Sequence, residues 1–270
     1  MSIVWEDYRD REQSAILDST VMDFYAHRLD LGNGGYDPNW STTSDGVPVC
    51  VRTGAKAQGP VIVGTTYGAY IAWTDYRNSA GYPGYRNRDV YVQYLLSATG
   101  SFPAGYNWTT NGIVAHQPNP CPAMGDSCNQ QNPDITLDYA IRTPLQGYGA
   151  IVAYEDDRAD EWQIFADDIG ADGSNLWGFD LHVAPNVGGA GGGGNQLDPR
   201  IASTGLPGDP NLGAVVTWRD ERNWVNAKSD IYAQRVTHLG APLWATTGLA
   251  LCTALEEQRR QRIAVKESVN

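Results

Sequence analysis

The sequence predicts an all-β protein built as a four-bladed β-propeller, and three observations carry this prediction. The 270 residues include 30 Gly, 15 Pro, 15 Tyr and 9 Trp, and a chain so rich in turn formers and aromatic residues is typical of β-proteins. One short motif occurs four times along the chain. The strand that the first copy of the repeat lacks stands at the opposite end of the sequence.

The motif consists of two apolar residues, an aromatic residue and the pattern xDxR. Its copies are Trp5/Asp7/Arg9, Trp73/Asp75/Arg77, Tyr154/Asp156/Arg158 and Trp218/Asp220/Arg222. Alternate residues of a strand project from one face, so the repeated residues share a face and the variable ones between them share the other. An active site normally breaks the symmetry of its scaffold. We therefore interpret the repeated residues as structural, holding blade to blade, with ligand contact as the alternative.

Two further segments accompany each motif. Residues 23–28, 89–94, 163–168 and 230–235 alternate like strands and lead through turns to Trp40, Trp108, Trp177 and Trp244. Residues 58–64, 131–137 and 196–202 precede the second, third and fourth motifs, whereas the first motif has no such leader. The matching segment, QRRQRIAV, is found at 258–265. We therefore expect velcro closure, in which the C-terminal strand completes the N-terminal blade.

The whole chain, 1–270, is predicted to be one propeller domain. Blade 1 takes residues 1–50 and 256–270, blade 2 takes 51–116, blade 3 takes 130–187, and blade 4 takes 196–254. The third copy departs most from the pattern, because Tyr154, Gln163, Asp167 and Asp168 replace the Trp, Asp, Gln and Arg of the other copies. A polar cluster that the other blades lack is therefore expected in blade 3, if anywhere.

The four cysteines suggest one disulfide and leave a second one open. Cys121 and Cys128 bracket a proline-rich loop, and their spacing predicts a small disulfide-closed loop, with free thiols or metal binding as alternatives. Cys50 and Cys252 occupy equivalent positions at the ends of the first and fourth copies. A bridge between them would reinforce ring closure if their Cα atoms came within disulfide range.

Other motifs are weaker. Asn39 and Asn107 are glycosylation sequons at equivalent turns, although asparagine also simply suits such turns. The segment DIGADG at 168–173 is similar to a calcium loop but has Gly170 and Phe179 at ligand positions, so a hairpin turn is expected. We expect no cofactor, with a structural calcium ion elsewhere as the alternative. The chain has no GxSxG, phosphate-loop or HExxH motif.

The order WxDxR, DIYxQR, Gly and Trp resembles the propeller repeats of bacterial and archaeal extracellular proteins. The resemblance implies secretion and a surface or assembly role without a single ligand. A formal charge of -12 argues against nucleic acid and anionic membranes as partners. The longest apolar runs, such as 149–154, are far shorter than the roughly 20 residues of a membrane helix.

We expect the protein to be a non-enzymatic extracellular module that self-associates into a homo-oligomer or a homopolymer such as a filament, or forms part of a cell-surface structure. One alternative is a propeller that binds glycans or proteins through aromatic residues of its long loops, such as Tyr82, Tyr85 and Trp224. A propeller glycoside hydrolase is a further alternative, because the chain contains many carboxylates.

Overall fold

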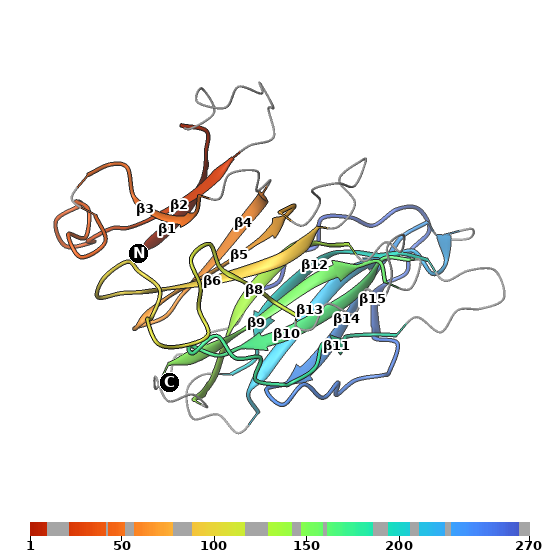
Figure 1. The fold of residues 1–270 in the computed structure, drawn as a ribbon. Coiled ribbons are helices and arrows are strands. Elements are labelled where there is room, and N and C mark those ends of the chain that lie inside the picture. Colours follow the sequence, from red (N-terminus) through yellow and green to blue (C-terminus); the bar gives the residue numbers. More distant parts are fainter. Residues whose placement is uncertain are drawn as a thin grey trace.

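The computed structural model describes residues 1–9, 22–41, 43–51, 57–77, 88–116, 129–141, 147–158, 161–185, 194–205, 211–224 and 228–264. Within these ranges the chain forms four antiparallel sheets that follow one another as blades (Figure 1). No helix in the described ranges is long and apolar enough to cross a membrane. The prediction of an all-β, propeller-like fold is confirmed.

Each sheet is a meander in which strands adjacent in sequence pair with each other. Blade 1 contains β1 (Ser2–Asp7), β2 (Asp23–Arg28) and β3 (Val47–Cys50). Blade 2 contains β4 (Ala57–Gly64), β5 (Gly68–Asp75), β6 (Asp89–Leu96) and β7 (Ile113–Val114). Blade 3 contains β8 (Gln130–Ile141), β9 (Tyr148–Asp156), β10 (Gln163–Ile169) and β11 (Leu181–His182). Blade 4 contains β12 (Gln196–Ser203), β13 (Gly213–Asp220), β14 (Asp230–Thr237) and β15 (Leu249–Cys252).

The repeated motif has the same register in every blade. The strands β1, β5, β9 and β13 each end at the aspartate of the motif. The aromatic residue of the motif lies opposite an aromatic residue of the next strand, in the pairs Trp5/Tyr25, Trp73/Tyr91, Tyr154/Phe165 and Trp218/Tyr232. Large side chains on one face of a sheet need an apolar surface opposite them, and a neighbouring blade supplies it.

The core lies between neighbouring blades. Trp73, Tyr154 and Trp218 are fully buried, and Trp73 meets Phe24 of blade 1 edge-on at 5.8 Å between ring centroids. The innermost strands β4, β8 and β12 lie next to one another, and β1 contacts β4. Trp5 is only half-buried, because among the described residues no blade packs on the face that its three counterparts bury.

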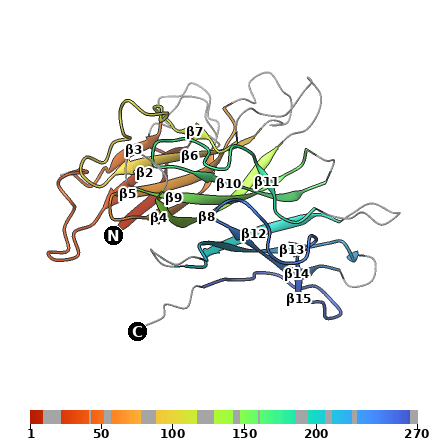
Figure 2. The same cartoon turned by 90° about the horizontal axis from the view of Figure 1, so that it is seen from below.

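The described residues do not show the predicted velcro closure. Residues 257–264 form no strand, and β1 pairs with β2 alone in the described part of the chain. The backbone N–H of Gln258 nevertheless donates to Ser229 at 3.0 Å, as those of Gln130 and Gln196 donate to the equivalent carbonyls of blades 2 and 3. The C-terminal segment therefore runs beside blade 4 (Figure 2) and makes the first hydrogen bond of an inner strand there without forming a strand.

No disulfide joins Cys50 to Cys252, so the bridge that the sequence left open does not form in this structure. The Sγ atom of Cys50 instead faces the motif of the next blade, 3.9 Å from Asp75 and 3.5 Å from Arg77. Cys50 thus faces blade 2, whereas Cys252 ends the last strand of blade 4, so the two cysteines do not face each other. The predicted pair Cys121 and Cys128 lies outside the described residues.

Candidate functional site

The repeated motif forms a clamp within each blade. In blade 2, Trp73 Nε1 donates to Asp75 at 2.9 Å, and the backbone N–H of Arg77 donates to the same carboxylate at 2.8 Å. The Arg77 guanidinium pairs with Asp75, stacks 3.7 Å above the ring of Tyr91 and donates to the carbonyl of Asn111. These contacts join three strands of one blade. Most contacts of the aspartate and arginine therefore lie inside one blade, although both also contact Cys50 of the preceding blade, against which the aromatic residue packs.

The same contacts recur in blades 1 and 4. The tryptophan-to-aspartate distances are 3.0 Å for Trp5/Asp7 and 2.8 Å for Trp218/Asp220, and Arg9 and Arg222 stack on Tyr25 and Tyr232. Since all these atoms bond to one another, the clamp leaves little for a substrate to bind. The clamp residues also do not line the central cavity described below.

Blade 3 replaces three parts of this arrangement together. Tyr154 takes the place of tryptophan, and its hydroxyl donates to Asp167 at 2.7 Å. Asp180 stands directly before the fourth strand, where blades 1, 2 and 4 have Gly46, Gly112 and Gly248. Those glycines have positive φ, and a Cβ on any of them would lie within 2.6 Å of a ring atom of the motif tryptophan. The smaller tyrosine ring removes this restriction and makes room for Asp180.

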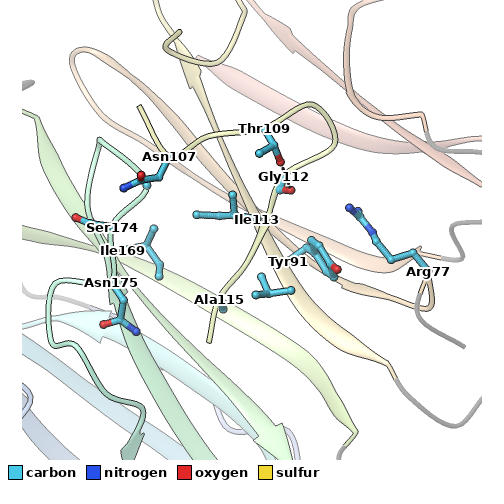
Figure 3. A pocket seen from close by; sticks show the side chains of 12 residues that line it. Arg77, Tyr91, Asn107, Thr109, Gly112, Ile113, Ala115, Ile169, Ser174 and Asn175 are labelled. Atoms are coloured by element: carbon cyan, nitrogen blue, oxygen red, sulfur yellow. Dashed lines mark hydrogen bonds between the residues drawn. The ribbon is translucent and has the colours of Figure 1, made fainter. Parts of the chain in front are cut away.

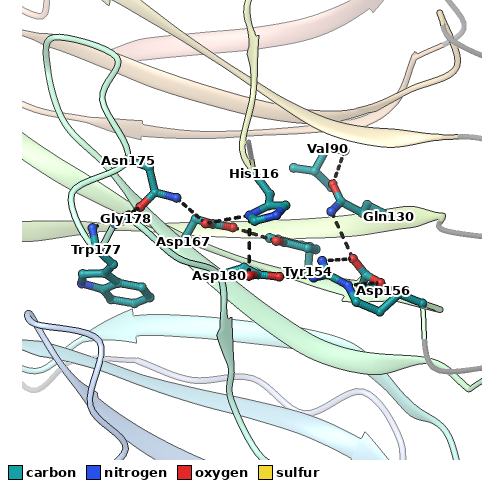
Figure 4. A network of polar contacts seen from close by, with 11 residues as sticks. Val90, His116, Gln130, Tyr154, Asp156, Asp167, Asn175, Trp177, Gly178 and Asp180 are labelled. Atoms are coloured by element: carbon teal, nitrogen blue, oxygen red, sulfur yellow. Dashed lines mark hydrogen bonds and ion pairs between the residues drawn. The ribbon is translucent and has the colours of Figure 1, made fainter. Parts of the chain in front are cut away.

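These replacements create a buried polar cluster between blades 2 and 3 (Figure 4). His116, just after β7, places Nδ1 3.8 Å from Asp167 and 3.7 Å from Asp180. Interaction with Asp167 raises the pKa of His116, and burial raises the pKa of Asp167. Arg158 pairs with both Asp156 and Asp180. Asp167 is fully buried and the side chain of Asp180 is 17% exposed, so the cluster joins two blades and its carboxylates are largely used by His116, Tyr154 and Arg158.

A cavity of about 580 Å³ lies beside this cluster, between blades 2 and 3 (Figure 3). Ile113 and Ile169 line it together with the polar residues Asn107, Ser174 and Asn175. No carboxylate is among the lining residues, so this cavity has no acid or base for hydrolysis. Both predicted sequon residues, Asn39 and Asn107, are exposed in turns, and Asn107 lies at this cavity.

The centre of the molecule is shaped by a bulge in each inner strand. Gly59, Asn132 and Asp198 have φ values of 60°, 52° and 57°, and each is followed by a proline. The backbone N–H of each residue donates to the variable residue of the preceding blade's motif, in the pairs Gly59/Glu6 at 3.2 Å, Asn132/Thr74 at 3.2 Å and Asp198/Glu155 at 2.7 Å. The non-repeated face of the motif therefore lies toward the centre.

A cavity of about 530 Å³ lies at these bulges. Four equivalent inner positions that line it carry Val61, Asp134, Arg200 and Arg262, and Asn132 and Asp198 line it as well. The backbone geometry repeats here, but the side chains do not. Two carboxylates from neighbouring inner strands, Asp134 of β8 and Asp198 of β12, thus share one cavity.

The environments of the acidic residues differ. Burial raises the pKa of Asp134, although the backbone N–H groups of Ile135 and Ile201 donate to its carboxylate at 3.1 Å and 3.0 Å. The side chain of Asp198 is 49 % exposed and lies 3.2 Å from the Nε atom of Arg219. Asp134 is therefore the carboxyl group that more readily keeps its proton, whereas Asp198 faces solvent beside the positive charge of Arg219.

Glu155 holds residues of the cavity wall in place through hydrogen bonds. Its carboxylate is fully buried and accepts hydrogen bonds from the side chains of Gln131 at 2.6 Å and Asn132 at 2.9 Å. Because it also binds the backbone of Asp198, it fixes two of the residues that line the cavity. Burial raises the pKa of Glu155 in spite of these donors.

Sequence reasoning missed this cavity. It singled out the repeated residues, which lie in the clamps, and loop aromatics, of which Trp224 is exposed while Tyr82 and Tyr85 lie outside the described residues. The sequence could have indicated it through the triplets QNP at 131–133 and LDP at 197–199, which place a polar residue before a proline in two inner strands. In the described ranges, no group of three or more His, Cys, Asp or Glu residues is arranged to hold a metal ion.

No protein-family model matches the chain. No curated protein is similar to it. Among solved structures, the chain is similar to the native arabinanase Arb43A of Bacillus subtilis, with a TM-score of 0.42 and 10% identity over 93% of this chain and 72% of that chain. That structure is named as an arabinanase, an enzyme, whereas the sequence led us to expect a non-enzymatic assembly module and a chain without enzymatic activity; these two expectations are not retained.

Proposed function

We propose that the protein is a glycoside hydrolase whose active site is the central cavity. The observation that carries the proposal is the pair Asp134 and Asp198, which line one cavity from neighbouring inner strands in otherwise different surroundings. Glycoside hydrolysis generally requires two carboxyl groups whose environments separate their roles. The proposal rests on the geometry of this cavity rather than on the structural similarity.

The two carboxyl groups have distinct tasks in this proposal. Asp134, whose pKa burial raises, gives its proton to the glycosidic oxygen as the bond from that oxygen to the sugar carbon breaks. Asp198 is the second carboxylate, which activates the attacking water in an inverting enzyme and attacks the sugar carbon itself in a retaining one. In both cases one water molecule is consumed, and its hydroxyl ends on the sugar carbon. Asn132 offers its amide oxygen to a sugar hydroxyl.

The test measures reducing ends released from a panel of polysaccharides that includes arabinan. Asp134→Asn and Asp198→Asn should each lower the rate at least 100-fold, in keeping with the usual contribution of general acid–base catalysis, about 10²- to 10⁴-fold. Asp30→Asn is the matched control, because Asp30 is an exposed turn residue outside the cavity. If the two cavity variants kept wild-type rates on every cleaved substrate, the proposed site would be wrong.

We also propose that the ring closes between blade 4 and blade 1. Arg260 has a φ of 62° two residues after Gln258, which is the conformation of the inner-strand bulges at Asn132 and Asp198. The side chain of Gln261 also binds the carbonyl of Asp198. The C-terminal segment thus already has the local conformation of an inner strand, and pairing with β1 would complete blade 1.

Exposed apolar side chains on blade 4 support closure. Val47 and Val49 of β3 are 9% and 2% exposed against blade 2, whereas their counterparts Leu249 and Leu251 of β15 are 47% and 55% exposed. In the first three blades a tryptophan donates to a carbonyl of the next blade, in the pairs Trp40/Leu96, Trp108/Ala171 and Trp177/His238. The fourth, Trp244, is 38% exposed. A blade seated on this face would bury all three side chains.

A further inference from the structure

The central cavity is lined by two arginines that form no ion pair with a carboxylate in the described part of the chain. Arg200 and Arg262 both line it. Within the described residues their guanidinium groups donate to the adjacent carbonyls of Pro199 and Gln261. Neither guanidinium forms an ion pair with a carboxylate of these residues, whereas every motif arginine pairs with an aspartate.

The two arginines occupy equivalent positions, Arg200 in the inner strand β12 and Arg262 in the C-terminal segment. They follow the bulges at Asp198 and Arg260, as Asp134 follows the bulge at Asn132. Their charges act on Asp134, lowering its pKa against the larger effect of burial. Arg200, Arg262 and the proposed proton donor are therefore within electrostatic reach of one another.

We infer that the central cavity binds a glycan that carries carboxylate groups, a uronic acid polymer or oligomer. This inference rests on the proposed function of the same cavity and adds its substrate class. The planar guanidinium binds a planar carboxylate through two parallel hydrogen bonds, which a neutral sugar cannot reproduce. Because Arg200 and Arg262 line the same cavity as Asp134, a sugar carboxylate held by them would lie near the glycosidic oxygen that Asp134 protonates.

The charge of the whole chain determines which probe suits the test. A formal charge of -12 repels a long polyanion at a distance. Short oligosaccharides limit this repulsion, so the probes are oligogalacturonates and alginate oligomers, each compared with its own methyl ester. Esterification removes the negative charge and leaves the sugar backbone unchanged.

Calorimetry on the full chain should show that a free acid binds at least tenfold more tightly than its ester. Arg200→Gln and Arg262→Gln should each weaken binding of the acid about tenfold, which corresponds to the loss of about 1.4 kcal/mol, and should leave binding of the ester unchanged. Arg259→Gln is the control for net charge, because Arg259 is 63% exposed and pairs with Glu257. Unchanged melting temperatures would show that the variants remain folded.

Equal binding of acid and ester, an equal effect of Arg259→Gln, or no binding of any acidic probe would overturn the inference. A preference for sulfated oligosaccharides over uronates would also contradict it, since it would assign the arginines to a different anion. Arginine-dependent binding of the acid without hydrolysis would contradict the proposed enzyme and leave the inference standing. If the protein hydrolysed only neutral glycans, and the arginine variants did not change the rate, the inference would be contradicted and the proposed enzyme would stand.

Discussion

At the scale of single residues, one motif has different energetic weight in different blades. Asp220 is fully buried and receives hydrogen bonds from Trp218 at 2.8 Å and from the backbone and Nε of Arg222 at 2.9 Å and 2.7 Å. Asp7 makes the same bonds at a partly exposed position of blade 1, where its side chain is 13% exposed and that of its partner Arg9 is 34% exposed. If a hydrogen-bond partner is removed, water can take its place at Asp7 but not at Asp220.

Asp220→Asn should therefore lower the free energy of unfolding by about 3 kcal/mol, as expected when one partner of a buried ion pair is removed. Asp7→Asn should cost clearly less, because exposed pairs contribute about 0 to 1 kcal/mol. Urea denaturation of both variants measures the difference. Equal losses would show that the two positions are equally buried in solution.

Asp7 also sets a limit at acidic pH. Its hydrogen bonds from Arg9 lower its pKa to about 2, below the value of about 3.9 in an unfolded chain. A lowered folded-state pKa stabilises the fold above the unfolded pKa, and this contribution is lost as the pH falls from about 4 toward 2. Between pH 4 and 2, wild type should lose more stability than Asp7→Asn. Parallel melting curves over that range would contradict the assignment.

At the scale of elements, the residue type in the turn before the last strand of a blade depends on the aromatic residue of the motif. A tryptophan in the motif leaves room only for glycine in that turn. Gly112 has a φ of 81°, and a Cβ there would lie 2.5 Å from Trp73. Gly105 has a φ of 82° but nothing within 4 Å of such a Cβ. The two glycines separate the cost of backbone conformation from that of steric overlap.

Gly105→Ala should cost about 1 to 2 kcal/mol of stability for the left-handed conformation alone. Gly112→Ala should cost this amount plus roughly 1 to 3 kcal/mol for overpacking against the tryptophan ring. Thermal unfolding of both variants tests the comparison. A Gly112→Ala protein as stable as Gly105→Ala would show that the ring moves aside freely.

The cluster of His116, Asp167, Asp180 and Arg158 makes the interface of blades 2 and 3 sensitive to pH. The pKa of His116 is raised in the folded chain, so its charge stabilises the fold below about pH 6.5 and the contribution is lost as the pH rises through the folded pKa. His116→Gln should thus be less stable than wild type at pH 5.5, with a smaller difference at pH 8.5. A pH-independent difference would assign His116 to packing alone.

At the scale of the whole molecule, closure decides whether the face of blade 4 is a surface or a core. In a closed ring, Leu251 would be as buried as Val49, which is 2% exposed. A carboxylate at either position would then be costly, because an unpaired buried charge must be neutralised or the structure must open.

Val49→Asp should strongly lower the melting temperature in any arrangement, because blade 2 covers that residue. Leu251→Asp should lower it by a similar amount only if the ring closes. Differential scanning calorimetry of both variants, with size analysis to confirm monomers, measures this. A Leu251→Asp protein that melts like wild type would contradict closure.

The sequence by itself determined the blades. Motif spacing and strand alternation depend on local geometry, so the strands that end at Asp7, Asp75, Asp156 and Asp220 could be read directly from the sequence. The departures of the third copy at Tyr154 and Asp167 were also visible, because a repeat exposes its own exceptions. The partner of these residues, Asp180, could not be recognised, since its contact with them depends on how the smaller tyrosine ring packs.

Only the tertiary structure decided which residues share a site. Asp134 and Asp198 are 64 positions apart in the sequence, and they come together because bulges turn neighbouring inner strands toward one cavity. Contact across blades depends on the angle between sheets, which no local pattern encodes. Repetition therefore specifies the scaffold from within each blade, whereas the chemistry depends on the central positions where the blades meet and their sequences differ.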